Sequence, residues 1–167
     1  MRIRRLLVVL SAIACLPLLA QGPPRPEAQI EAMKRLAGLA GNWTGTGWID
    51  FGGRRMTFSG GERVQSKLAG TAMLVEGSFS SKIGDKEVPV HTTLGVISFD
   101  PATKQYRFDT WLATGTSGEH EVELIDGGWQ WQMSGPRGRT RYIVKMTADE
   151  WFEIGERSAD GTSWTQF

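Results

Sequence analysis

Turn-forming residues recur along most of this chain, and their spacing constrains the fold more than any other feature. After Gly41, clusters containing glycine or aspartate fall at positions 52–53, 69–70, 84–85, 100–101, 115–118, 126–128, 135–138, 148–149 and 160–161. The runs between them are short and rich in Val, Ile, Thr and aromatic residues, which is typical of antiparallel strands joined by turns. The pattern predicts strands at 42–51, 56–67, 73–81, 90–99, 105–114, 120–124, 129–134, 140–146, 151–156 and 163–167.

Several of these runs alternate strictly between apolar and polar residues. Trp129, Trp131 and Met133 share one face of a strand, while Gln130 and Gln132 share the other. One face of the sheet is therefore expected to be buried and the other to meet water. Nine or ten such strands would leave exposed edges in a flat sheet. We therefore predict an all-β fold, an antiparallel nine- or ten-stranded up-and-down barrel preceded by one short helix.

The predicted helix covers residues 26–40 and begins at Pro26, a residue that suits the first turn. We expect Gly38 or Gly41 to end it. Its apolar side chains, at helical spacing, are Ile30, Met33, Ala37 and Ala40. This stripe predicts a helix that packs on the core or caps the barrel.

The first twenty residues resemble an export signal. Three arginines precede an apolar stretch at 6–19, which is short for a membrane span, and Ala20 offers a small residue for cleavage. We predict a signal peptide at 1–20, a Pro-rich spacer at 21–26 and a single domain at 27–167 in an exported, periplasmic or secreted protein. The segment 12–15 also resembles a lipoprotein box, so lipidation of Cys15 is the alternative.

Processing changes the charge of the working protein. The whole chain has 19 basic and 18 acidic residues, and residues 1–20 contain three of the arginines, no acid and the single cysteine. The mature chain would carry 16 basic and 18 acidic residues, a net charge of −2. This balance argues against nucleic-acid partners, and the loss of Cys15 excludes thiol chemistry in the mature domain.

The start of the first predicted strand resembles a known superfamily. Gly41-Asn42-Trp43, the segment 94–101 and the segment 106–111 together resemble the calycins, and in particular a bacterial lipocalin-like domain family of unknown function. The resemblance covers about residues 36–167, makes Gly41 and Trp43 its structural signature, and implies a barrel whose central cavity holds a small apolar or amphipathic ligand. Two features depart from related barrels. The last strand has no basic residue to pack across Trp43, and the region after Arg141 has no histidine to bind haem, so we expect no cofactor.

Parity along the strands selects the residues expected to line that cavity. If Trp43 points inward, Glu62 shares its face with the apolar residues of the second strand and becomes a candidate polar anchor; a bulge at 60–61 would turn it to water. The candidate ligand-binding residues are Phe58, Glu62, Phe108, Trp129, Trp131 and Tyr142. We name no catalytic residue and no metal ligand, since His91 and His120 belong to different strands without a ligand motif and are expected at the surface or at strand ends.

Three classes of function remain open at this point. The first is non-covalent binding of a small, largely apolar ligand in a Trp-lined cavity. The second is a structural or partner-binding envelope protein whose barrel is filled by its own side chains. The third is an enzyme built in the cavity, which would need at least two convergent titratable groups.

Overall fold

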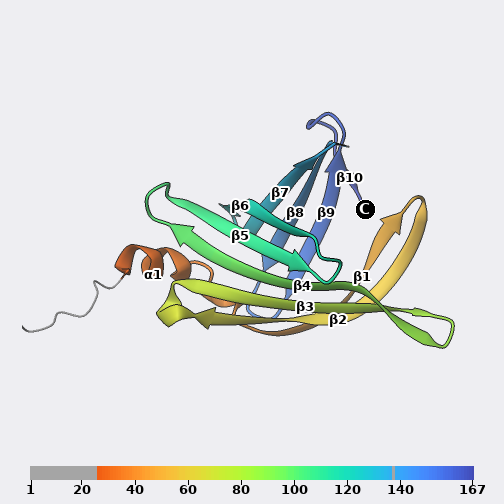
Figure 1. Cartoon of the computed structure of the whole chain (residues 1–167), viewed down its shortest axis with the longest axis horizontal. Helices are drawn as coiled ribbons and strands as arrows, with labels where there is room; N and C mark the ends of the chain where they lie inside the picture. Colours follow the sequence, from red (N-terminus) through yellow and green to blue (C-terminus); the bar gives the residue numbers. More distant parts are fainter. Residues whose placement is uncertain (1–25, 137) are drawn as a thin grey trace, which may run out of the picture.

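The chain folds into one strongly curved antiparallel sheet with a short helical segment at one end (Figure 1). The computed structural model describes residues 26–136 and 138–167. The predicted signal peptide at 1–20, the alternative lipidation site at Cys15 and residues 21–25 of the spacer lie outside the described residues. Their assignment stays a prediction.

Ten strands follow one another, as the turn spacing predicts, and each overlaps its predicted range. Their bounds are β1 (Gly41–Phe51), β2 (Arg54–Lys67), β3 (Ala72–Ile83), β4 (Lys86–Asp100), β5 (Gln105–Leu112), β6 (Ser117–Ile125), β7 (Gly128–Gly135), β8 (Gly138–Met146), β9 (Trp151–Ser158) and β10 (Thr165–Gln166). A short 3-10 turn, η2 (Leu68–Gly70), joins β2 to β3.

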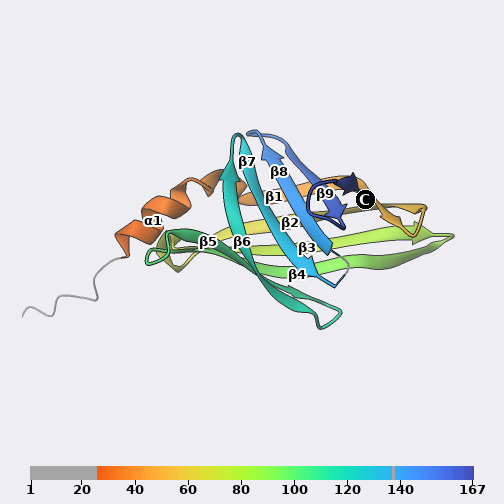
Figure 2. The same ribbon diagram turned by 90° about the horizontal axis from the view of Figure 1, so that it is seen from above.

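The strand order confirms an all-β, up-and-down architecture. The sheet runs from β1 to β10 in chain order, and each strand pairs antiparallel with its neighbours. The predicted closure is wrong, however, because β1 and β10 end the order without pairing. Figures 1 and 2 show the result, a curled half-barrel that stays open between β1 and the last strands.

Unequal strand lengths explain why the sheet does not close. β2, β3 and β4 have 14, 12 and 15 residues, whereas β5 to β9 have only 8 or 9. The short strands curl over one half of the long ones and leave the β1–β2 and β3–β4 hairpins projecting (Figure 2). β10 has only two residues, too few to bridge β9 to β1.

The helical segment is shorter than predicted. α1 (Glu27–Lys34) ends six residues before the predicted end at 40, and a 3-10 turn, η1 (Ala37–Leu39), follows it. This change of helical period rotates the following residues, so the predicted stripe is wrong beyond Met33: Ala37 and Ala40 are exposed. Leu36 and Leu39 point inward instead, at 5% and 2% exposure.

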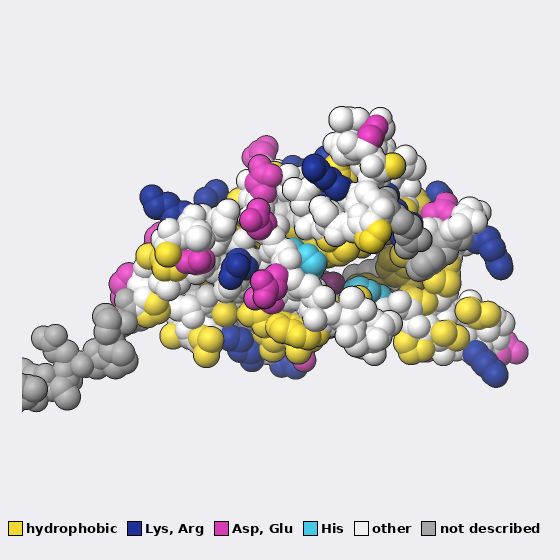
Figure 3. Space-filling model, turned by 45° about the horizontal axis from the view of Figure 1, so that its top comes forward, with side chains coloured by type: hydrophobic (Ala, Val, Ile, Leu, Met, Phe, Trp, Pro, Cys, Tyr) yellow, Lys and Arg dark blue, Asp and Glu magenta, His cyan; other side chains and the backbone are white. Residues whose placement is uncertain are grey.

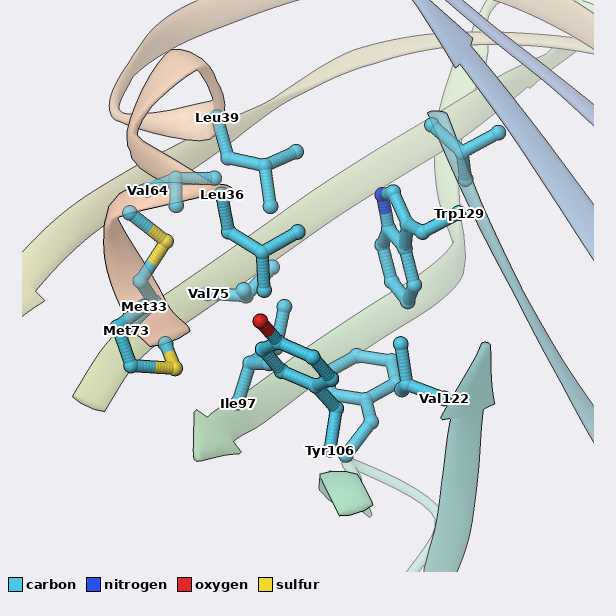
Figure 4. Packing of buried hydrophobic residues seen from close by; sticks show 12 residues of the cluster. Met33, Leu36, Leu39, Val64, Met73, Val75, Ile97, Tyr106, Val122 and Trp129 are labelled. Atoms are coloured by element: carbon cyan, nitrogen blue, oxygen red, sulfur yellow. The ribbon is translucent and has the colours of Figure 1, made fainter. Parts of the chain in front are cut away.

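The hydrophobic core lies at the end of the half-barrel that the helical segment covers. Met33, Leu36 and Leu39 pack there against inward side chains of β2 to β8 (Figure 4). Two hydrogen bonds hold the segment in place: the Tyr106 hydroxyl donates to the Ala32 carbonyl at 2.7 Å, and the Trp43 Nε1 donates to the Leu39 carbonyl at 2.9 Å. Side chains thus pack the interior of the covered end, and the open part of the concave face lies beyond it.

Candidate functional site

Glu62 lies on the concave face, as parity predicts. The β1–β2 register is continuous, so no bulge interrupts the strand at 60–61. Glu62 pairs with Trp43 on one side and with Gly77 on the other. A Cβ at Gly77 would lie 3.2 Å from the Glu62 Oε1, so this carboxylate lies against the backbone of Gly77, which has no side chain.

A second carboxylate, Glu153 on β9, approaches Glu62 from the opposite wall. Glu153 pairs with Val144 of β8, which is fully buried in the core, and therefore belongs to the concave face. The Trp151 Nε1 donates a hydrogen bond to the Glu153 Oε2 at 3.3 Å. Sequence reasoning missed Glu153, although its parity with Trp151 was the available signal.

Both carboxyl groups hold protons unusually tightly. Burial raises the pKa of Glu62 to about 7, and the charge of Glu153 raises it further. Burial also raises the pKa of Glu153 to about 7, opposed by the hydrogen bond from Trp151. The Glu153 side chain is exposed to water in the hollow, yet protein surrounds that hollow. Water in the hollow screens the charge of this carboxylate.

A continuous row of rings crosses the concave face beside the carboxylates. Trp131 stacks on Tyr142 at a centroid distance of 4.3 Å and an angle of 14°. Tyr142 meets Phe167 edge-to-face at 5.9 Å, and His120 lies 4.6 Å from Trp131 on the other side. Trp131, Tyr142 and Phe167 are each only partly buried, so the row keeps apolar surface open to the hollow.

The remaining predicted site residues divide between the core and the projecting hairpins. Phe108 and Trp129 are core residues, 6% and 3% exposed. Phe58 belongs to a separate group on the hairpins, where its ring meets Phe79 at 5.6 Å and lies over Gly47. Of the six predicted residues, the structure therefore brings Glu62, Trp131 and Tyr142 to the open concave face beside Glu153.

We call this part of the concave face the trough, lined by Trp43, Glu62, Trp131, Tyr142 and Glu153. Figure 3 shows a hollow in the molecular surface, with histidine, acidic and hydrophobic side chains around it. The trough is open along one side, in contrast to the central cavity that the resemblance implies. The side chains that line it are held by strands on either wall, so its shape is part of the fold rather than of a loop.

Two other hollows lie near the helical segment, and the first of them shares Trp131 with the trough. One, of about 500 Å³, has Arg35, Lys104 and Tyr106 in its wall with residues of β6, β7 and β8. The other, of about 510 Å³, lies between η1 and the β6–β7 turn and reaches Trp129 and Met146. Neither is lined by Glu62 or Glu153. We place the candidate site in the trough, because that is where titratable groups and open aromatic surface coincide.

Both histidines face the concave side, where His91 is exposed and His120 is partly buried. His91 pairs with Phe79, and its ring lies 6.3 Å from that ring. The His120 Nε2 lies 3.0 Å from the Thr110 Oγ1 in a hydrogen bond. Burial lowers the pKa of both imidazoles, which are therefore neutral at pH 7. No cluster of three metal-ligating side chains occurs within residues 26–136 and 138–167.

The comparisons with known proteins leave the family open. No family model matches the chain, and no curated protein matches it. The fold defines the class of protein as an antiparallel all-β half-barrel, compatible with a lipocalin-like architecture. In the part of the chain that the structure describes, no helix has the length and apolar character needed to cross a membrane.

Proposed function

We propose that the trough binds a small molecule with a largely apolar body, and that Glu62 and Glu153 anchor its polar group. One observation carries this proposal: the stacked Trp131–Tyr142 pair stays partly open on a concave face beside two carboxylates. Rings in a completed core would be covered, as Trp129 is at 3% exposure. Partly open aromatic surface with a few convergent polar groups is typical of ligand sites.

A filled interior, the structural alternative, describes only one end of the molecule. The core cluster and the helical segment fill the half-barrel around Leu39, Ile97 and Val144. Beyond them the concave face carries carboxylates instead of packed apolar side chains. Burying such groups is unfavourable unless they have partners, so a purely structural role gives no reason to place them there.

Dye binding tests the proposal directly. The probe is N-phenylnaphthylamine, a neutral apolar dye that fluoresces when it leaves water. We expect saturable binding, weakened about tenfold by Trp131→Ala. The matched control is Trp111→Ala, because Trp111 is 47% exposed on the convex face. Absence of binding to the wild-type protein, or an equal loss in both variants, would contradict the proposal.

Acid–base catalysis is the second candidate, and the pKa values of the carboxylates favour it. General acids and bases act best when their pKa lies near the working pH, and Glu62 and Glu153 both have values of about 7. Two titratable groups converge here, which an enzyme in this face would need. A turnover that follows a bell-shaped pH profile, and that Glu62→Gln removes while dye binding persists, would distinguish catalysis from binding alone.

We also infer that the protein is exported, with residues 1–20 as the signal. The support is the arginine-rich start followed by an apolar stretch of limited length. The intact mass of the mature protein tests this inference. A chain beginning at Gln21 is expected; a lipid-bearing chain beginning at Cys15 would favour the alternative, and an uncleaved chain would contradict export.

A further inference from the structure

The two trough carboxylates have no cation partner among the described residues. Within residues 26–136 and 138–167, the ion pairs are Lys34–Glu31, on the helix, and Arg141–Glu156, neither of which involves Glu62 or Glu153. The only hydrogen bond to either trough carboxylate in these residues is the one that Trp151 donates to Glu153. Among the described residues, the two trough carboxylates therefore have no cationic partner, and Glu62 accepts no hydrogen bond.

An indole accompanies each carboxylate, and the two indoles touch. Trp43 is the cross-strand partner of Glu62, and Trp151 bonds Glu153. Their rings meet edge-to-face at 5.8 Å, which links β1 to β9 where the backbones do not pair. Aromatic faces attract cations, and carboxylates accept charge-assisted hydrogen bonds. An alkylammonium group offers three donors and a positive charge that suit both.

Within residues 26–136 and 138–167, no lysine or arginine forms an ion pair with Glu62 or Glu153. The guanidinium of Arg157, also on β9, lies 3.9 Å from the centre of the Phe167 ring and acts on Tyr142 rather than on Glu153. His91 hydrogen-bonds to Thr93, and His120 contacts the aromatic row. Burial lowers the pKa of both imidazoles, so neither supplies a positive charge at neutral pH.

We propose that the ligand of the trough is a primary amine with an apolar body, whose ammonium group lies between Glu62 and Glu153 while the body covers Trp131 and Tyr142. This inference rests on the proposed function, because it names the chemical class bound at the same site. The aromatic row defines where the body lies, and the two opposed walls define where the charge lies. A neutral head group would leave the carboxylates without an opposite charge, and an anionic one would be repelled by them.

The amine also determines how binding depends on pH. Glu62 and Glu153 both have a pKa of about 7, so below neutral pH each carries a proton that an ammonium group must displace. The charge of Glu153 also reaches Tyr142 and raises the pKa of its hydroxyl, whereas Arg157 lowers that pKa. Amine affinity should therefore fall by about tenfold per pH unit below 7 for each carboxylate that must ionise.

Three probes with the same alkyl chain test the inference: octylammonium, octanol and octanoate, each displacing N-phenylnaphthylamine at pH 8. We expect octylammonium to bind at least about tenfold more tightly than octanol, and octanoate to bind most weakly. In the double variant Glu62→Gln, Glu153→Gln the preference for octylammonium over octanol should disappear. Glu76→Gln is the matched control, since Glu76 lies exposed on the convex face of β3.

The outcomes separate this inference from the proposed function. If octanol or octanoate equals octylammonium while the dye binds, the amine assignment is wrong and the apolar site stands. A preference for octylammonium that survives the double variant would also overturn the assignment. If neither the dye nor any probe binds, the proposed function itself fails. Dye binding by each variant shows that it still folds with an intact aromatic row.

Discussion

Replacing Glu62 with glutamine should stabilise the protein above neutral pH and leave its stability unchanged in acid. Glutamine keeps the shape of a protonated glutamic acid but cannot ionise. In acid, where Glu62 is protonated, the wild-type protein and Glu62→Gln should therefore have similar free energies of unfolding. Above neutral pH the wild-type protein must hold a charge over the backbone of Gly77 and opposite Glu153, and the variant does not.

The size of the effect follows from the pKa of Glu62. Its ordinary value is 4.5 and its value in the folded protein is about 7. Below pH 4.5 both folded and unfolded chains are protonated, and between 4.5 and 7 only the unfolded chain ionises. Wild-type stability therefore falls as the pH rises through this window, by ~3 kcal/mol in total for Glu62. Glu153 adds a smaller amount of the same sign, because its side chain is exposed.

Urea unfolding followed by tryptophan fluorescence provides the measurement, at several pH values between about 4 and 8. Glu62→Gln should match the wild-type protein at the acid end and exceed it by up to ~3 kcal/mol at the alkaline end. The control Glu76→Gln, on the exposed convex face, should stay within about 0.5 kcal/mol throughout. A pH-independent difference between Glu62→Gln and wild type, or a variant that is less stable at pH 8, would refute the reasoning.

Four further substitutions test the packing around the trough. Tyr106→Phe removes the hydroxyl bond to the helix and should cost about 1 kcal/mol, with faster amide exchange in α1. Gly155→Ala places a Cβ 2.9 Å from the Phe167 ring and should lower the melting temperature, at a cost of about 1–3 kcal/mol. Trp129→Phe should destabilise the protein less than Trp43→Phe in the same urea assay, since only the Trp43 N–H has an acceptor to lose.

Local pattern was sufficient to predict the strands and the direction of most side chains. Glycine and aspartate clusters mark the turns, and period-two alternation assigned Trp131 and Tyr142 to the buried face. Glu62 followed from the same parity, once no bulge shifted the strand at 60–61. These properties depend on neighbours in the sequence or on one adjacent strand, which is why a single sequence contains them.

Properties that depend on the whole sheet could not be obtained in this way. Closure depends on how ten strand lengths combine, and the two-residue β10 leaves the sheet open. Glu153 has the right parity, but its importance comes from Glu62, which lies on a distant strand across the trough. The helical stripe was wrong after Met33 because a 3-10 turn follows α1, and no propensity argument located that change.

The distribution of stability along the half-barrel explains how a costly pair of carboxylates is tolerated. Met33, Leu36 and Leu39 complete a core at one end, and the carboxylates lie beyond it on the open concave face. The hydrophobic contacts that stabilise the fold are thus separate in space from the carboxylate pair that destabilises it at neutral pH. A cation seated between Glu62 and Glu153 would bind the folded chain only, so it would stabilise that chain by linkage. The negative charge of Glu62 and Glu153 lowers the stability of the protein above pH 7, and the same charge is what an amine ligand would recognise.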